Sequence, residues 1–112
     1  RRVNLIQEQV ATTKQNTEDA LIDAISAIQA AAADPNADAE LLDQARKLHR
    51  KAQFMWDFVS AENSTGFHNP EYALKILAES TNLARQAQML AAQSVDDMSL
   101  LQTGIYYQTS GQ

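Results

Sequence analysis

Strong helix breakers interrupt this chain at only two places before its last ten residues. The first is the stretch "DPNAD" at residues 34–38, and the second is "STGFHNP" at residues 64–70. Proline lacks a backbone N–H and moves the residue before it out of helical geometry, and glycine weakens a helix interior. The two breaks predict helices over about residues 3–33, 38–63 and 70–93, followed by a poorly structured C-terminal tail over residues 94–112.

Apolar residues recur at steps of three and four in each predicted helix, which is the pattern of one buried face. In the first helix this stripe weakens where Thr13 and Thr17 occupy the expected positions. Several inward positions of the third helix are alanine, so we expect close packing there. The predicted inward residues are Val3, Ile6, Val10, Leu21, Ile25 and Ile28, then Leu41, Ala45, Leu48, Ala52, Met55, Trp56 and Val59, and then Ala73, Ile76, Leu77, Ser80, Leu83, Ala84, Ala87, Leu90 and Ala91.

The predicted fold class is therefore all-α, with long antiparallel helices in a three-helix, bundle-like arrangement. Helices of roughly 24 to 31 residues are about 36 to 46 Å long, whereas the mean helix has about 11 to 12 residues. So slender a bundle leaves apolar surface near its ends, and we expect another part of the same protein or a second copy to cover it. The chain begins with Arg1 and Arg2 rather than Met, which favours a processed chain or a piece of a longer one.

Charge and composition argue against several functions. The formal net charge of -5 disfavours nucleic-acid binding, and the one basic cluster, "RKLHRK" at residues 46–51, is typical of a solvated helix face. The chain has no cysteine, which excludes disulfides, thiolate metal sites and covalent haem attachment within these residues. No apolar run approaches the roughly 20 residues that a membrane-spanning helix needs.

No catalytic residue is predicted within the chain, because no serine stands at a spacing that brings a histidine to it. The acidic residues Glu18, Asp19 and Asp23 are predicted to form a solvated helix face, and Asp96 and Asp97 a terminal cap. The two histidines match no zinc-binding spacing. Of these, His49 lies within a helix and is interpreted as a partly exposed structural residue.

His68 has a more unusual setting, on the short turn between the second and third predicted helices. Asn69 is a natural helix N-cap and Pro70 suits the first helical position, so the turn ends in a defined way immediately after the histidine. Two interpretations remain open from local chemistry. The imidazole is either hydrogen-bonded within the turn, or it ligates a metal or cofactor held elsewhere, as a single axial haem ligand does.

Residues 50–77, "RKAQFMWDFVSAENSTGFHNPEYALKIL", resemble the C-terminal region of the ammonia-forming cytochrome c nitrite reductases, which are multihaem enzymes. Their pattern there is Arg-x-Ala-Gln-x-x-Trp-Asp-(Phe/Leu), and then a His-x-Pro whose histidine follows the Trp-Asp pair by eleven or twelve residues. The matching positions here are Arg50, Ala52, Gln53, Trp56, Asp57, Phe58, His68 and Pro70. By helix pattern the resemblance extends over residues 1–93, the expected C-terminal domain, and leaves the tail unmatched. Octahaem relatives share similar C-terminal helices, so pentahaem and octahaem enzymes both remain possible.

The resemblance implies a periplasmic homodimer that reduces nitrite to ammonium with electrons passed through covalently attached haem c groups. It implies that His68 is the distal axial ligand of one haem iron, and that the long helices contribute to the dimer. The partners would be the haem-binding N-terminal part of the same chain and a second copy, with nitrite as substrate. The haem-attachment and catalytic residues would precede Arg1, so no cofactor is expected in the isolated fragment. The alternative is a free-standing helical protein-interaction module without a cofactor.

Overall fold

The computed structural model describes residues 2–64 and 69–102, and within them every regular element is a helix. Helix α1 spans Arg2–Ala32, α2 spans Ala39–Ser64, α3 spans Pro70–Ser94, and a short 3₁₀ helix, η1, spans Met98–Leu101. The three long helices begin and end within a residue of the predicted positions. The predicted all-α fold with three long helices is confirmed.

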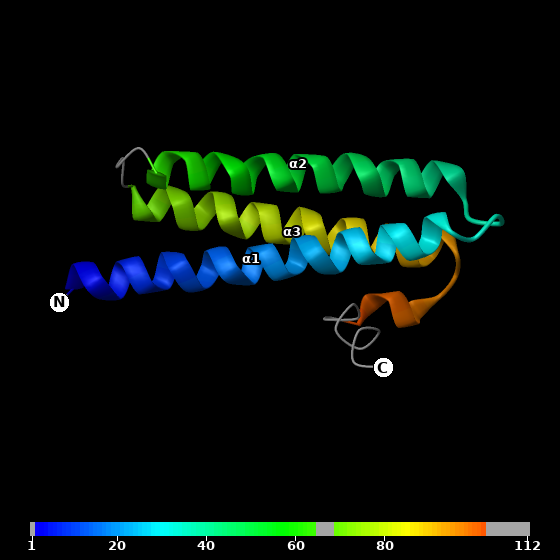
Figure 1. Ribbon diagram of the computed structural model, residues 1–112, viewed down its shortest axis with the longest axis horizontal. Coiled ribbons are helices and arrows are strands. Elements are labelled where there is room, and N and C mark those ends of the chain that lie inside the picture. The colour runs from blue at the N-terminus through cyan, green and yellow to red at the C-terminus, as the bar shows by residue number, and fades with distance from the viewer. Residues whose placement is uncertain (1, 65–68, 103–112) are drawn as a thin grey trace.

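The three helices lie side by side, with α3 between α1 and α2 (Figure 1). The chain runs along α1, returns along α2 and runs along α3 in the same direction as α1. Because α3 contacts both other helices more extensively than they contact each other, the molecule is elongated and thin, measuring 52 × 31 × 18 Å. Figure 1 also shows that the first half of α1 diverges from its neighbours toward the N-terminus.

Polar contacts between helices fix their registers. His49 and Trp56 of α2 hydrogen-bond to backbone carbonyls of α1, His49 to that of Leu21 and Trp56 to that of Lys14. The residue numbers in each pair add to the same value, which is the relation that antiparallel packing requires. Between α1 and α3 the separations are 60, 64 and 62 residues in three contacts, and so nearly constant a separation means parallel packing.

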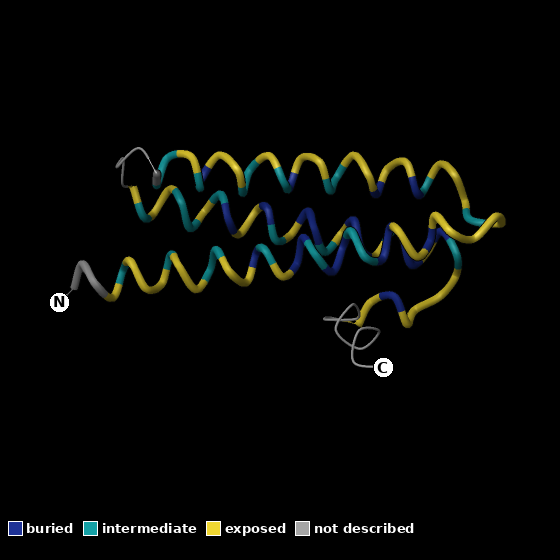
Figure 2. Tube along the Cα trace, in the orientation of Figure 1, coloured by how far each residue is buried: buried dark blue, intermediate teal, exposed yellow. Residues whose placement is uncertain are grey.

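Small residues line the seam where the helices meet. Ala20, Ala24, Ala27 and Ala31 recur at steps of four and three along α1, and all are fully buried. Ala45 and Ala52 of α2 and Ala84, Ala87, Ala91 and Ala92 of α3 are fully buried as well. Figure 2 shows these buried positions gathered where the three helices run closest, while the first half of α1 is mostly exposed. The core is therefore built by close backbone approach rather than by large side chains.

Side chains and turns satisfy the backbone groups at the helix ends. The Asp38 carboxylate accepts hydrogen bonds from the N–H groups of Glu40 and Leu41 at the start of α2. The predicted Asn69 cap of α3 is confirmed, because its side chain accepts from the Tyr72 N–H at 3.2 Å, with Pro70 at the first helical position.

Helix α3 ends in a Schellman motif: the Asp97 N–H donates to the Ala92 carbonyl and the Asp96 N–H to the Gln93 carbonyl. Asp96 adopts the left-handed conformation that this motif requires, with φ of 52°. Asp97 then caps η1, whose Leu100 is buried against the bundle. The predicted tail thus begins with an ordered segment, and its last ten residues, 103–112, lie outside the described part of the chain.

The alanine seam predicts the effect of enlarging one of its members. Ala84→Leu adds volume where the exposed fraction is zero, so we expect the free energy of unfolding to fall by about 1–3 kcal/mol. Urea denaturation of residues 1–112, followed by helical circular dichroism, measures it. Ala78→Leu is the matched control, because Ala78 lies exposed on the same helix and its substitution should change stability by less than about 0.5 kcal/mol. Equal effects at the two sites would contradict the packing account.

The cap of η1 predicts a dependence on pH. Hydrogen bonds from the Ser99 hydroxyl and the Ser99 backbone N–H lower the pKa of Asp97 below its ordinary value of 3.8. A carboxyl whose pKa is lower in the folded state stabilises the fold above its unfolded pKa, and this contribution is lost as the pH falls through the folded value. We therefore expect the cap to persist at pH 5 and to be lost below pH 3.8. The chemical shift of the Ser99 amide in an NMR titration reports this step, and Asp97→Asn should abolish it; a step above the ordinary value would contradict the prediction.

Candidate functional site

The predicted ligand, His68, lies outside the described residues, so its role stays a prediction. The structure does describe both sides of its turn. Helix α2 ends at Ser64, and α3 begins at Pro70 after the Asn69 cap. Asn69 is the residue next to His68, and its capping hydrogen bond fixes the point at which the chain re-enters the bundle.

A groove of about 500 Å³ opens at this end of the bundle, where α1 diverges from the other helices. Its lining is mainly apolar and comes from the N-terminal half of α1, the end of α2 and the start of α3. The lining residues are Ile6, Gln7, Val10, Ala11, Lys14, Asn63, Asn69, Pro70 and Ala73. Two of them, Asn69 and Pro70, belong to the predicted His-x-Pro element itself. The two residues that follow the predicted ligand therefore line a mainly apolar groove.

Trp56, the aromatic residue of the predicted family motif, ties α2 to α1 just beyond this groove. Its indole N–H donates to the Lys14 carbonyl at 3.1 Å, and the Lys14 ammonium lies 5.1 Å from the ring centroid, within cation–π range. Lys14 also lines the groove. These contacts hold α1 against α2 at Lys14, before α1 diverges toward its N-terminus, so Trp56 helps to shape the groove.

The other motif residues have distinct structural roles. Ala52 is fully buried, and its carbonyl accepts a hydrogen bond of 2.7 Å from the Ser80 hydroxyl of α3. Gln53 donates to the Asp57 carboxylate at 3.1 Å on the surface of α2. Phe58 is 39% exposed, and its neighbour Phe54 is 69% exposed. Part of the motif thus serves packing, while its phenylalanine, Phe58, and Phe54 between the motif positions are both exposed.

His49 holds α2 to α1 through the Leu21 carbonyl, 3.0 Å from its Nε2. A carbonyl oxygen can only accept, so Nε2 carries the proton and donates. A second groove, of about 360 Å³, is lined by His49, Trp56, Gln53, Glu18, Leu21, Ile22 and Ile25. The structure confirms His49 as a partly buried structural residue, and its Nε2 is engaged within the bundle.

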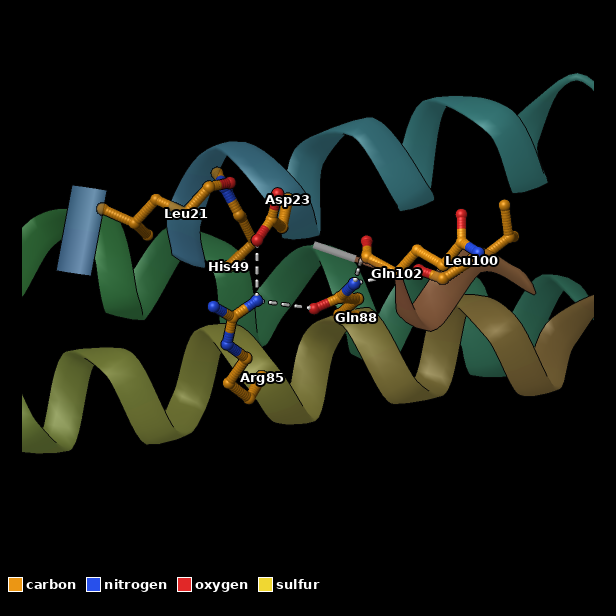
Figure 3. Close-up of polar contacts among 7 residues, drawn as sticks. All are labelled: Leu21, Asp23, His49, Arg85, Gln88, Leu100 and Gln102. Atoms are coloured by element: carbon orange, nitrogen blue, oxygen red, sulfur yellow. Dashed lines mark hydrogen bonds and ion pairs between the residues drawn. The ribbon is translucent and has the colours of Figure 1, made fainter. Parts of the chain in front are cut away.

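The prediction that Asp23 belongs to a solvated acidic face is wrong. Asp23 is only 2% exposed, and its carboxylate is 2.8 Å from Nη1 of Arg85 on α3. Arg85 also donates to the Gln88 side chain at 3.0 Å, and Gln88 in turn reaches the segment after α3 (Figure 3). Asp23 lies three residues after buried Ala20 and four before buried Ala27, so its position on the inward face could have been inferred from helical spacing.

The remaining sequence predictions concern charge, catalysis and metals. The basic cluster is solvated, as predicted, because Arg46, Lys47, Arg50 and Lys51 are all exposed. The Ser80 hydroxyl is engaged by the Ala52 carbonyl. Across residues 2–64 and 69–102, no three His, Asp or Glu side chains converge in a way that could hold a metal ion. None of the helices described is long and apolar enough to cross a bilayer.

Comparison with known proteins places this sequence in a family. The model of the cytochrome c552 family matches residues 1–108. The cytochrome c nitrite reductase subunit NrfA of Nitratidesulfovibrio vulgaris (strain Hildenborough) is 53% identical over 55 residues, which are 49% of this chain and 10% of that protein. The chain thus matches only about a tenth of the length of this curated relative. No solved structure matches the chain significantly. The family match spans nearly the whole sequence and confirms the predicted resemblance, and the chain belongs to the cytochrome c552 family.

Proposed function

We propose that residues 1–112 form the C-terminal helical part of a multihaem c-type cytochrome that reduces nitrite to ammonium. The observation that carries this proposal is the family match over residues 1–108. The nitrite reductase subunit that is 53% identical over 55 residues supports the choice of reaction. Within this proposal the protein is periplasmic, as the resemblance implies. The same match favours the enzyme over a free-standing helical interaction module.

The absence of cysteine bears on which functions these 112 residues would carry and which would lie elsewhere in the protein. A family of c-type cytochromes implies haem c, and covalent attachment of haem c requires cysteines, which these residues lack. Haem attachment therefore belongs to other parts of the protein, and we propose that nitrite binds there as well. The 112 residues would supply packing surface, one axial ligand and part of a dimer contact. Their main partner would be the haem-binding part of the same chain.

The residues present fit one axial contact to a haem. The chain has two histidines, and Nε2 of His49 is hydrogen-bonded to the Leu21 carbonyl. His68 is therefore the better candidate for an iron ligand. The Asn69 cap anchors the residue next to it, and the groove lined by Asn69 and Pro70 offers apolar surface near the same turn. A haem bound by this imidazole would supply one-electron transfer toward the catalytic centre. His68 would hold the iron from the distal side, and α3 would hold His68.

Replacing the proposed ligand tests this assignment in the full-length protein. We expect His68→Ala to remove the low-spin signal of one haem from the optical and electron paramagnetic resonance spectra, because an axial nitrogen is lost. We also expect slower nitrite reduction with electrons supplied by an external donor.

His49→Gln is the matched control, since it replaces the other histidine and should leave the number of low-spin haems unchanged. An unchanged spectrum in the His68→Ala protein would show that His68 is not a ligand. Loss of the signal in both variants would point to a general loss of structure instead.

The outward face of α2 is the best candidate for the dimer contact. Phe54 and Phe58 are exposed there, directly after the basic cluster. Exposed aromatic residues next to charged ones are typical of interaction surfaces. This face also lies away from α3, whose opposite sides are already covered by α1 and α2 (Figure 1).

The charges on this face suit a second copy of the same helix. If two α2 helices cross antiparallel at Phe54, a residue before Phe54 faces the residue equally far after it on the other helix. Lys51 then lies opposite Asp57 of the partner subunit, and Arg50 lies opposite Phe58 of the partner subunit. The first pair has opposite charges and the second allows a cation–π contact. This self-complementarity supports a homodimer through α2.

A charge exchange tests the proposed register. In the full-length protein we expect Lys51→Glu to weaken the dimer by about two- to tenfold in Kd, because it places two like charges together on each side of the axis. Adding Asp57→Lys should restore the affinity, because the pairing is then reversed rather than lost. Phe54→Glu at the centre should weaken the dimer more than tenfold. Sedimentation velocity measures all three variants.

Gln44→Glu, also exposed on α2, is the control for added negative charge and should leave Kd unchanged. If the dimer of the double variant is no tighter than that of Lys51→Glu alone, the proposed register is contradicted. If Phe54→Glu leaves the dimer intact but lowers haem content, the face is covered by the haem-bearing part of the same chain.

A further inference from the structure

The segment after α3 turns back and packs on the bundle, and a single side chain of α3 holds its backbone. The Gln88 amide nitrogen donates to the Leu100 carbonyl at 2.9 Å and to the Gln102 carbonyl at 3.3 Å. Gln88 is only 2% exposed, so water has little access to its side-chain amide. The two carbonyls belong to the C-terminal half of η1 and the residue that follows it.

The hydrogen bonds of the Gln88 amide define which way its oxygen and nitrogen point. That oxygen accepts from Nη1 of Arg85 at 3.0 Å. An arginine can only donate, and the Leu100 and Gln102 carbonyls can only accept, so exchanging the amide oxygen and nitrogen would break all three contacts. Arg85 therefore favours the one amide orientation in which the nitrogen of Gln88 faces the Leu100 and Gln102 carbonyls.

Arg85 is held in turn by a residue of another helix. The Asp23 carboxylate of α1 lies 2.8 Å from the same nitrogen, Nη1, that contacts Gln88 (Figure 3). Charge-assisted hydrogen bonds of this length are stronger than neutral ones, and the burial of Asp23 limits competition from water. The contacts thus run without a break from α1 through α3 to the segment after it.

We infer that Asp23 is a positioning residue for residues 98–102, acting through Arg85 and Gln88. The carboxylate orients the guanidinium, the guanidinium orients the amide, and the amide holds two backbone carbonyls of the C-terminal segment. The place at which the chain leaves the bundle is then set by α1, far away in the sequence, as well as by the local Asp97 cap. This role does not depend on any haem or on nitrite reduction.

Hydrogen–deuterium exchange of the full-length protein tests the inference, read by mass spectrometry on peptides that cover residues 98–102. Gln88→Met keeps the shape but removes both donors, so exchange in these peptides should rise roughly thirtyfold, about tenfold or less for each bond lost. Asp23→Asn keeps a neutral acceptor but removes the charge, so exchange there should rise about fivefold. Peptides from the middle of α3 should keep their protection in both variants.

The double variant separates positioning from general stabilisation. If Asp23 acts through Gln88, adding Asp23→Asn to Gln88→Met should produce no further rise in residues 98–102. The control is Asp43→Asn, which removes the exposed Asp43–Lys47 ion pair and should leave exchange in this segment unchanged. Effects that multiply in the double variant, or a rise that spreads evenly over all helices, would overturn the inference. Unchanged exchange in Gln88→Met would show that the Asp97 cap alone holds the segment.

Discussion

The close approach of α3 to its two neighbours is the constraint on which the rest of the structure depends. Fully buried alanines on all three helices allow this approach, because no large side chain separates the backbones. Backbone carbonyls at the seam then come within reach of side chains on the facing helix. Ser80 reaches the Ala52 carbonyl, and Thr17 lies 3.3 Å from the Leu77 carbonyl. Each such contact specifies how two helices align along their length, which a purely apolar seam would do less well.

That register determines what lies at each end of the bundle. The Trp56 and His49 contacts hold α1 to α2 in one alignment, and beyond them α1 diverges and leaves the groove beside Asn69. At the other end, the backbone N–H of Asp38 donates to the Ser94 carbonyl, which joins the start of α2 to the end of α3. At the end that carries His68, the Asn69 cap fixes where α3 begins. The proposed ligand role of His68 would need such an anchor beside it.

The sequence predicts the helices well because Pro35 and Pro70 act locally and the apolar spacing is regular. It predicts the Asn69 cap for the same reason, since a cap depends on neighbouring residues only. The prediction for Asp23 is wrong because a carboxylate is usually solvated, whereas Asp23 shares the buried face of α1 with Ala20 and Ala27. The left-handed Asp96 could not be foreseen, because glycine is the usual residue there. The proposed role of His68 would depend on groups outside these residues, so the proposal rests on the family resemblance.

The central claim is that these helices are one part of a haem-bearing reductase. The most direct measurement is the complete coding sequence of the protein upstream of Arg1. The account predicts several Cys-x-x-Cys-His motifs in it, because covalent haem c requires cysteines that the 112 residues lack. An upstream sequence without any such motif would contradict the claim.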